Sequence, residues 1–428
     1  MNREIHVGIL GLGTVGSGTY QVLRDNAAQI TRVVGAPVTV TRVAELDWTP
    51  ERCALVPAER RGTDAAALVA DPQIDVVVET IGGTGVARKL VLAAIAAGKS
   101  VVTSNKELIA CHGAEILDAA AERGVDVQFE GVVGGVIPIV RSLKESLAAC
   151  RIDEVVGIVN GTTNYVLTCM SEEGAEFAEV LAQAQALGYA EAAPRAAVEG
   201  LDAANKLAIL ASVAFGARVE VTSIYREGIT RISPVDLDYA DRMGMVVKLL
   251  AIGRRAGERL ELRVHPALIS QEHPLASVSG VFNAIFVRGP ECGDVMLYGR
   301  GAGALPTGAA VAGDVVDCAR NLLGNCRGRV PCRCEGPAQV VPLEEIESSL
   351  YLRTEVQDQP GVLGAMATVF GEEGVSIGSC IQETTDGQVA EIVWVLHRGP
   401  EGRFRRALAR LREMPVVEEI SSVIRVVE

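Results

Sequence analysis

The chain has 428 residues, of which 49% are hydrophobic and 4% aromatic, and its formal net charge is −14. This length allows two or three domains, and the apolar content excludes a globally disordered chain. The negative charge argues against nucleic acid and anionic membranes as partners, because both require basic patches.

No apolar run reaches the length of about 18 residues that a membrane-spanning helix needs, so no membrane partner is expected. No signal peptide is visible, and the 10 cysteines are scattered along the chain. They indicate reduced thiols in a cytoplasmic protein. Cys326, Cys332 and Cys334 cluster, but their spacing matches no common zinc pattern.

The first third of the chain alternates strands with helices, which predicts a doubly wound parallel sheet of the Rossmann type over residues 1–130. The apolar patterns predict strands at 5–10, 38–46, 75–79, 100–103 and 125–130, with helices at 14–30, 85–97 and 107–123.

The remaining chain predicts two further domains. Residues 131–324 are expected to form an α+β catalytic and dimerisation domain with an open mixed sheet, whose helix 308–323 packs back on the first domain. Residues 325–347 are rich in Pro, Gly, Cys and charge and are interpreted as a linker. Residues 348–428 have the order βαββαβ, which is the ferredoxin-like arrangement.

A glycine-rich turn follows the first strand directly. Gly11, Gly13 and Gly16 form a G-x-G-x-x-G pattern that opens a helix. Such a turn lets the backbone approach a pyrophosphate, which rests at the helix N-terminus. The sequence therefore predicts a dinucleotide site, which includes Thr14 and Val15. Glu45 and Asp47, at the end of the second strand, can bond a ribose 2′-hydroxyl and favour NAD over NADP, although Arg42 and Arg52 lie near enough to support NADP.

The segment 188–206, GYAEAAPRAAVEGLDAANK, precedes a long apolar helix. Asp202 and Lys206 are spaced by one helical turn and share a face. A lysine held beside a carboxylate can exchange a proton with an alkoxide, whereas an isolated pair of this kind is more often a surface ion pair.

Several motifs together resemble the homoserine dehydrogenases. They are the segment above, VVTSNK at 101–106, GIVNGTTNY at 157–165 and G-A-G with Pro306-Thr307 from residue 301 onward. The pattern D-x-P-G-V-L at 358–363 resembles the start of an ACT domain. The resemblance implies NAD(P)-dependent interconversion of L-aspartate 4-semialdehyde and L-homoserine in a homo-oligomer, with an amino-acid effector such as threonine at the ACT domain.

The resemblance also implies roles for individual residues. Lys206 would exchange the proton at the substrate hydroxyl, and Lys106 would support it. Glu191, Asp202, Tyr189 and Thr162 would bind substrate, and Thr80, Ser104, Lys106 and Gly303 would contact the cofactor. A monovalent cation, usually sodium, would be held by Glu130, Val133, Gly135 and Ile137.

The chain departs from the family pattern at three positions. Ala193 and Ala197 stand where the family usually has acidic residues, and Val136 stands where it usually has glycine. Glu199 is a candidate to compensate for Ala197. A catalytically weakened amino-acid sensor and a dehydrogenase of another amino acid therefore remain as alternatives.

Overall fold

The computed structural model describes residues 3–332, 334–384 and 389–427. The chain divides into two compact units. The first unit contains the residues up to Val155, residues 205–222 and residues 282–338, and the second contains residues 156–204, residues 223–281 and the chain from Gln339 onward. Among the described residues, no helix is both long and apolar enough to cross a membrane.

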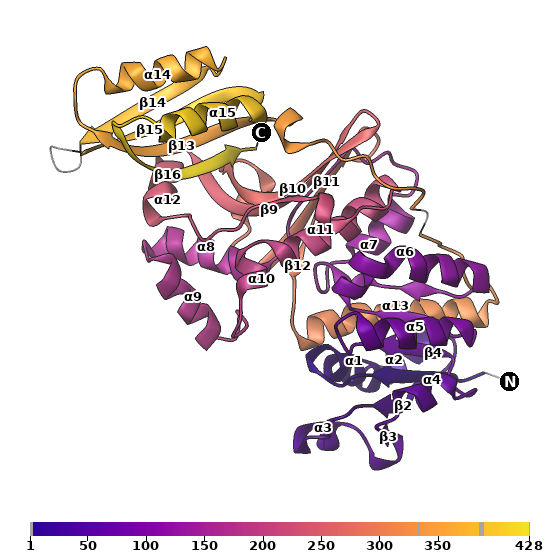
Figure 1. Cartoon of the computed structure of the whole chain (residues 1–428). Coiled ribbons are helices and arrows are strands. Elements are labelled where there is room, and N and C mark those ends of the chain that lie inside the picture. Colours follow the sequence, from indigo (N-terminus) through magenta and orange to yellow (C-terminus); the bar gives the residue numbers. More distant parts are fainter. Residues whose placement is uncertain (1–2, 333, 385–388, 428) are drawn as a thin grey trace. The chain divides into compact units, whose positions relative to one another are not determined.

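The first unit is built on a parallel sheet with the strand order β3-β2-β1-β4-β5-β6 (Figure 1). The expected Rossmann-type fold class is confirmed. Strands β1, β4 and β5 are short, mainly apolar runs that are almost wholly buried, as expected for a sheet covered on both faces. The strands are β1 Ile5–Leu10, β2 Val38–Ala44, β3 Arg61–Gly62, β4 Val76–Glu79, β5 Ser100–Thr103 and β6 Val127–Gln128.

The helices of this unit include one from a distant part of the chain. Helix α13 runs beside α1, and Val311 and Val315 of α13 pack in one core with Ile9 of β1 (Figure 1). The two helices approach closely at Gly18 and Gly308, because a Cβ on Gly308 would lie 2.5 Å from the Gly18 carbonyl carbon. The helices are α1 Thr14–Asp25, α2 Ala27–Val34, α3 Pro50–Leu55, α4 Ala65–Ala70, α5 Gly85–Ala96, α6 Lys106–Arg123, α7 Ile139–Arg141 and α13 Ala304–Leu323.

Two expectations for the first unit are corrected. The single helix expected over residues 14–30 is broken at Asn26, which ends α1 and begins α2. Asn26 has φ −103° and ψ 16°, outside the helical range, so its backbone conformation and not a side-chain cap interrupts the helix. The strand expected at 125–130 pairs only over Val127–Gln128, after which the chain turns into a short 3₁₀ segment. An antiparallel hairpin, β11 Phe282–Gly289 and β12 Gly293–Arg300, also belongs to this unit.

The second unit has a mixed sheet with the order β7-β9-β10-β16-β13-β15-β14. Strands β9 and β10 pair antiparallel over twelve residues each. The sequence interpretation missed β9, because MVVKLLAIGRRA lacks the alternation that marks a half-buried strand. The strands are β7 Glu154–Ile158, β8 Tyr225–Arg226, β9 Met245–Ala256, β10 Arg259–Ser270, β13 Glu347–Gln357, β14 Ile377–Thr384, β15 Val389–Pro400 and β16 Val417–Val426.

The C-terminal part of this unit has the predicted βαββαβ order, with α14 and α15 packed over the antiparallel strands β16-β13-β15-β14. Its edge strand β16 continues the sheet by pairing in parallel with β10, with Ala267 opposite Arg425 and Leu268 opposite Val426. The helices of the second unit are α8 Gly161–Glu173, α9 Phe177–Ala186, α10 Arg195–Val198, α12 Pro234–Arg242, α14 Val362–Glu372 and α15 Glu401–Arg412, with α11 Leu201–Phe215 beginning here.

Candidate active site

The glycine-rich turn has the geometry that a dinucleotide requires. Gly11 has φ +86°, and a Cβ on Gly16 would lie 2.2 Å from the Gly11 carbonyl oxygen. The Thr80 hydroxyl, at the end of β4, donates to the same oxygen at 2.8 Å and ties the turn to the neighbouring strand. Helix α1 begins at Thr14 and Val15 with Gly13 at its N-cap, so its first amides are available to an anion.

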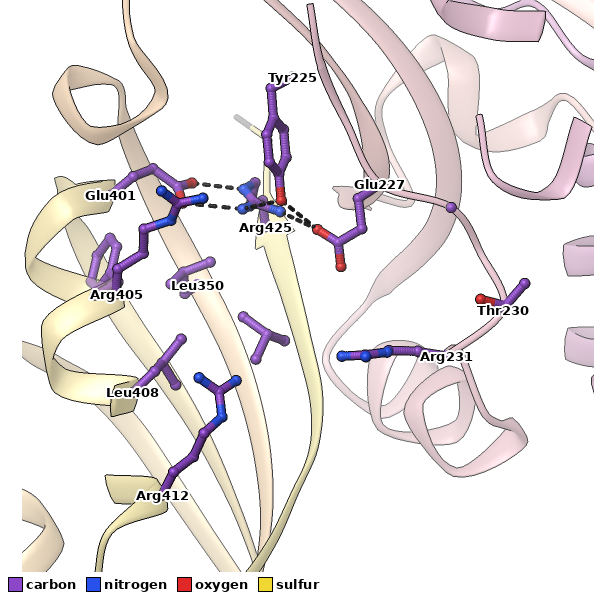
Figure 2. A pocket seen from close by; sticks show the side chains of 13 residues that line it. Tyr225, Glu227, Thr230, Arg231, Leu350, Glu401, Arg405, Leu408, Arg412 and Arg425 are labelled. Carbon is purple, nitrogen blue, oxygen red and sulfur yellow. Dashed lines mark hydrogen bonds and ion pairs between the residues drawn. The ribbon is translucent and has the colours of Figure 1, made fainter. Parts of the chain in front are cut away.

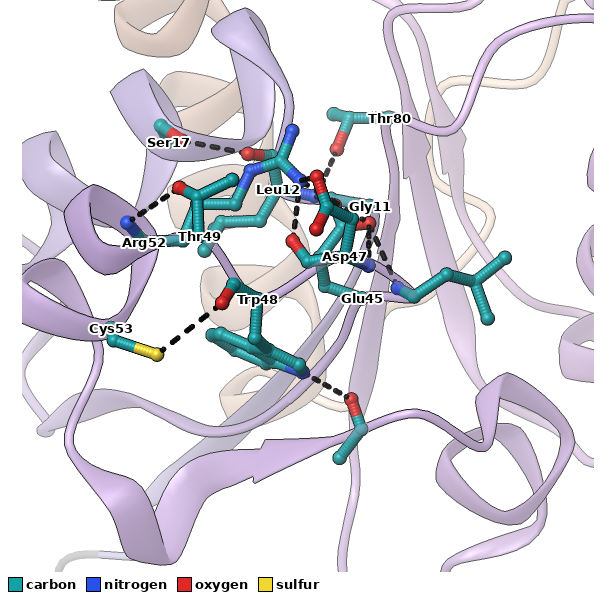
Figure 3. A network of polar contacts seen from close by, with 12 residues as sticks. Gly11, Leu12, Ser17, Glu45, Asp47, Trp48, Thr49, Arg52, Cys53 and Thr80 are labelled. Atoms are coloured by element: carbon teal, nitrogen blue, oxygen red, sulfur yellow. Dashed lines mark hydrogen bonds and ion pairs between the residues drawn. The ribbon is translucent and has the colours of Figure 1, made fainter.

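Glu45 is bound to this turn. Its carboxylate accepts hydrogen bonds from the Leu12 amide at 2.6 Å and the Leu46 amide at 2.8 Å (Figure 3). Burial opposes ionisation, but these backbone hydrogen bonds outweigh it and lower the pKa of Glu45. Glu45 therefore remains an ionised acceptor at the carboxyl end of β2. Asp47, two residues further on, has a side chain that is 78% exposed.

Arg52 lies in the same network, which bears on cofactor choice. Its guanidinium is 3.7 Å from the Glu45 carboxylate and 3.4 Å from that of Asp47 (Figure 3). The side chain is anchored by a hydrogen bond to the Asp47 carbonyl. Glu45, Asp47 and Arg52 therefore lie together at the end of β2. The sequence alone did not decide between NAD and NADP at this position.

The carboxyl ends of β4 and β5 carry a buried polar network that the sequence interpretation missed. The Thr103 hydroxyl donates to Glu79 at 2.6 Å, and Glu79 also accepts from the Ile81 amide at 2.8 Å. Asn105 caps α6 by accepting from the Leu108 amide and donates to the Gly83 carbonyl at 2.7 Å. Glu79 could have indicated this network, because it ends an otherwise apolar strand and a buried ionisable side chain needs polar partners.

Two predicted cofactor residues follow this network directly. Ser104 is half-buried, and Lys106 is the first residue of α6. They stand where open α/β sheets bind ligands, outside the carboxyl ends of the strands. The predicted cofactor residue Gly303 belongs to the same unit and stands at the N-cap of α13 with φ +120°.

In the second unit, the structure brings Thr162 and Tyr189 together. The Thr162 hydroxyl donates to the Tyr189 carbonyl at 2.6 Å, and the rings of Tyr165 and Tyr189 lie 5.1 Å apart. Glu191 is exposed two residues later, and its carbonyl accepts from the Gln185 amide at 3.1 Å. The segment 189–191, which carries two of these predicted substrate residues, is therefore held against α8 and α9 by these contacts.

Asp202 and Lys206 are one turn apart on α11 and are both buried, at 8% and 9% exposure. Asp202 accepts a hydrogen bond from Asn160 at 2.8 Å. Asn160 also caps α8 by accepting from the Thr163 amide at 2.9 Å. Burial distinguishes this pair from an ordinary surface ion pair. Asn160, which lies in the motif at 157–165, was not among the predicted site residues, although it contacts Asp202 directly.

Glu199, the candidate to compensate for Ala197, has a partner of its own in this structure. The Glu199 carboxylate accepts from Arg195 at 2.8 Å, in an exposed pair one helical turn apart.

The loop predicted to hold a cation presents a different side-chain arrangement from the one expected. Both oxygens of the buried Glu130 carboxylate accept from backbone amides, those of Val140 at 2.8 Å and Arg141 at 2.7 Å. Burial raises the pKa of Glu130, and burial together with the nearby Glu130 raises the pKa of Asp314 to about 7. Val133 and Ile137 are buried, and Gly135 has φ +58°. Within the described residues, no cluster of His, Cys, Asp and Glu could hold a metal ion.

The D-x-P-G-V-L turn of the C-terminal part borders a cavity of about 350 Å³. Gly361 has φ +92° and stands at the N-cap of α14. Gln382 and Ile392 line the same cavity from β14 and β15. The turn thus has room for a small ligand at a helix N-terminus.

The glycine turn, the parallel sheet and the polar strand ends define a dinucleotide-dependent dehydrogenase with a C-terminal ACT domain. Three family models match: the homoserine dehydrogenase NAD-binding domain over residues 11–130, homoserine dehydrogenase over 138–316, and the ACT domain over 350–416. The chain belongs to the homoserine dehydrogenase family.

Individual relatives agree with the family models. The chain is 48% identical to a homoserine dehydrogenase of Synechocystis sp., with 99% of each chain covered. A homoserine dehydrogenase structure from Thiobacillus denitrificans superposes with a TM-score of 0.94 at 41% identity and covers 100% of this chain and 99% of its own. A hyperthermophilic archaeal homoserine dehydrogenase, solved in complex with NADPH, matches 74% of this chain and 98% of its own, with a TM-score of 0.63 and 26% identity.

Proposed function

We propose that the chain interconverts L-aspartate 4-semialdehyde and L-homoserine with a nicotinamide cofactor. The observation that carries this proposal is the burial of Asp202 and Lys206 on one face of α11, at the end of the family's signature segment 188–206. A buried lysine beside a carboxylate is costly to retain for stability alone, whereas proton exchange at a hydroxyl requires such a group.

The residues divide the chemistry as follows. A nicotinamide cofactor, held at the turn of Gly11, Gly13 and Gly16, would supply or accept the hydride. Lys206 donates a proton to the oxygen of the substrate as the aldehyde is reduced and removes it in the reverse direction. Lys106, at the carboxyl end of β5, adds positive charge that favours an alkoxide. Asp202 and Glu191 hold the polar groups of the substrate, and Tyr189 and Thr162 line its pocket.

NAD is favoured as the cofactor. The ionised Glu45 at the end of β2 accepts hydrogen bonds and repels a ribose 2′-phosphate. Arg52 moderates this preference, because a guanidinium can bind a phosphate, and the archaeal relative was solved with NADPH. We therefore propose activity with both cofactors and a lower KM for NAD.

A monovalent cation, sodium, is proposed at the loop after β6. Each carboxylate oxygen of Glu130 accepts one amide hydrogen bond and keeps a further lone pair, so the side chain would still serve as a ligand. The other ligands would be backbone carbonyl oxygens of Val133, Gly135 and Ile137, which is suitable chemistry for a hard cation. Val136 is 41% exposed, so its departure from glycine creates no buried overlap.

Regulation by a small amino acid, threonine, is proposed at the cavity beside Asp358, Pro360 and Gly361, within a homo-oligomer. Support comes from the size of this cavity, about 350 Å³, and from the exposed start of α14. The amides there can donate hydrogen bonds to the carboxylate of an amino acid.

The test is steady-state oxidation of L-homoserine followed by NAD(P)H absorbance. Lys206→Met should lower kcat by about 10² to 10⁴-fold, the range for loss of a general acid–base. Lys89→Met, a change of an exposed lysine on α5, is the matched control and should retain activity. Wild-type protein that reduces neither cofactor with homoserine, or a Lys206→Met variant with unchanged kcat, would refute the proposal.

A further inference from the structure

A second cavity, distinct from the one beside Asp358, lies where the ACT domain meets the segment that follows α11. Its volume is about 490 Å³, and we name it the junction cavity. The segment 225–231 forms one wall, and α15 with β16 of the ACT domain forms the other (Figure 2). Both walls belong to the second unit.

The junction is held in place by Arg425 on β16. Its guanidinium donates to Glu401 of the ACT domain at 2.7 Å and to Glu227 of the segment 225–231 at 2.8 Å. It also donates to the Tyr225 hydroxyl at 3.1 Å. Together with the pairing of β16 and β10, these contacts join the two walls at one end of the cavity (Figure 2). The positive charge of Arg425 is balanced by the two glutamates.

Two further arginines have charges that are not matched. Arg231 lines the cavity from the segment 225–231, and Arg412 lines it from α15 (Figure 2). Among the residues that the structure describes, neither guanidinium has an ion-pair or hydrogen-bond partner. Arg405 adds a third guanidinium, which pairs with Glu344 outside the cavity. This cationic group is notable in a chain whose net charge is −14.

Four apolar side chains also line the cavity, beside the polar Thr230 and the carboxylates that pair with Arg425. Leu350, Phe404, Leu408 and Val423 line the same space, and Phe404 is 2% exposed. A volume within the usual range for small-molecule sites, together with apolar side chains and guanidinium groups in one lining, is suited to an anion that carries a hydrophobic portion. Guanidinium forks bind carboxylate and phosphate oxygens in pairs.

We propose that the junction cavity binds a small organic anion, a carboxylate or a phosphate ester, between Arg231 and Arg412. Such a ligand would join α15 of the ACT domain to the segment 225–231, because each side contributes one of the two arginines. Its apolar portion would rest on Leu350 and Phe404.

The bound anion would affect the segment 188–206, which carries the proposed substrate residues, through backbone contacts. The Ile229 amide donates to the Val198 carbonyl at 2.9 Å, and a Cβ on Gly228 would lie 2.2 Å from the same oxygen. Val198 precedes Asp202 by four residues, so a shift of the segment 225–231 reaches the start of α11 directly. This coupling rests on the proposed function of Asp202, whereas anion binding does not.

Calorimetric titration of the full-length protein tests the binding. The probes are phenyl phosphate and 3-phenylpropionate, each at constant ionic strength, and either one should bind with one site per chain. Arg231→Gln and Arg412→Gln should each weaken that binding at least tenfold. Arg403→Gln is the matched control, because it removes an exposed charge from the same helix outside the cavity.

Each outcome has a defined meaning. Binding of only one probe supports the proposal and identifies the anion as a phosphate ester or a carboxylate. Absence of binding by both probes, or equal binding by wild type and both cavity variants, overturns it. Unchanged melting temperatures show that the variants fold. For the coupling, the probe should change the KM for homoserine at least twofold in wild type and not in the double variant, and a constant KM with intact binding refutes the coupling alone.

Discussion

Lys248 provides a test of how burial of a charge governs the stability of the second unit. It lies on β9 with 6% exposure, and its ammonium donates to the Val278 carbonyl at 2.6 Å. Burial lowers the pKa of Lys248 to about 8, and Glu172 offsets this only in part. The folded state therefore binds this proton less strongly than the unfolded state does.

The sign of the pH dependence follows from that difference. Below about pH 8 the lysine is charged in both states, and the native state carries the full cost of burying the charge. The cost falls as pH rises from about 8 toward 10.5, where the lysine is neutral in both states. At about 1.4 kcal/mol per pKa unit, the gap between 8 and 10.5 corresponds to roughly 3 kcal/mol.

Replacing Lys248 with methionine removes this cost while keeping the length of the side chain. The Val278 carbonyl still accepts from the Asn164 amide at 3.2 Å, so it is not left without a partner. After subtraction of one lost hydrogen bond, worth about 1 kcal/mol, the variant should be about 2 kcal/mol more stable at pH 7.

Thermal unfolding of wild type and Lys248→Met at pH 7, 8.5 and 10 measures this effect. The melting temperature of the variant should be several degrees higher at pH 7, and the advantage should shrink by pH 10. Lys89→Met, at an exposed site, should show no such trend. A variant that is less stable at pH 7, or an advantage that is constant across pH, would contradict the reasoning.

Three further predictions concern the active site and its support. Asn160→Ala removes both the cap of α8 and the bond to Asp202, so the KM for homoserine should rise by about ten- to a hundredfold, measured by steady-state kinetics, whereas an unchanged KM would exclude a positioning role. Gly308→Ala forces a Cβ against the α1 backbone and should destabilise the protein by about 1–3 kcal/mol with a raised KM for NAD, while Gly313→Ala on the same helix, whose nearest neighbour would be 4.0 Å away, should be neutral or stabilising. Leu46→Arg, at a position that is 86% exposed beside Glu45, should raise kcat/KM with NADP relative to NAD, and an unchanged ratio would show that this strand end does not select the cofactor.

Most of the fold could be predicted from local patterns. The glycine turn after β1 and the βαββαβ order of the C-terminal part are properties of short segments, and both appear where the sequence places them. Strand β9 could not be recognised in this way, because it is defined by its pairing with β10 rather than by alternation. The close approach of α13 and α1 also depends on residues almost 300 positions apart, Gly18 and Gly308.

The sequence by itself identified the family of this protein, because a family signature consists of residue types at fixed spacing. It predicted Lys206, Asp202 and the glycine turn as site residues without reference to three-dimensional contacts. The tertiary structure decided which of these side chains are buried and with whom they pair. Asn160 donates a hydrogen bond to Asp202, and the Leu12 amide donates one to Glu45. Glu199 accepts a hydrogen bond from Arg195. The junction cavity likewise exists only because β16 pairs with β10 and brings Arg412 to the same space as Arg231. Burial and partnership depend on long-range packing, which residue spacing does not encode.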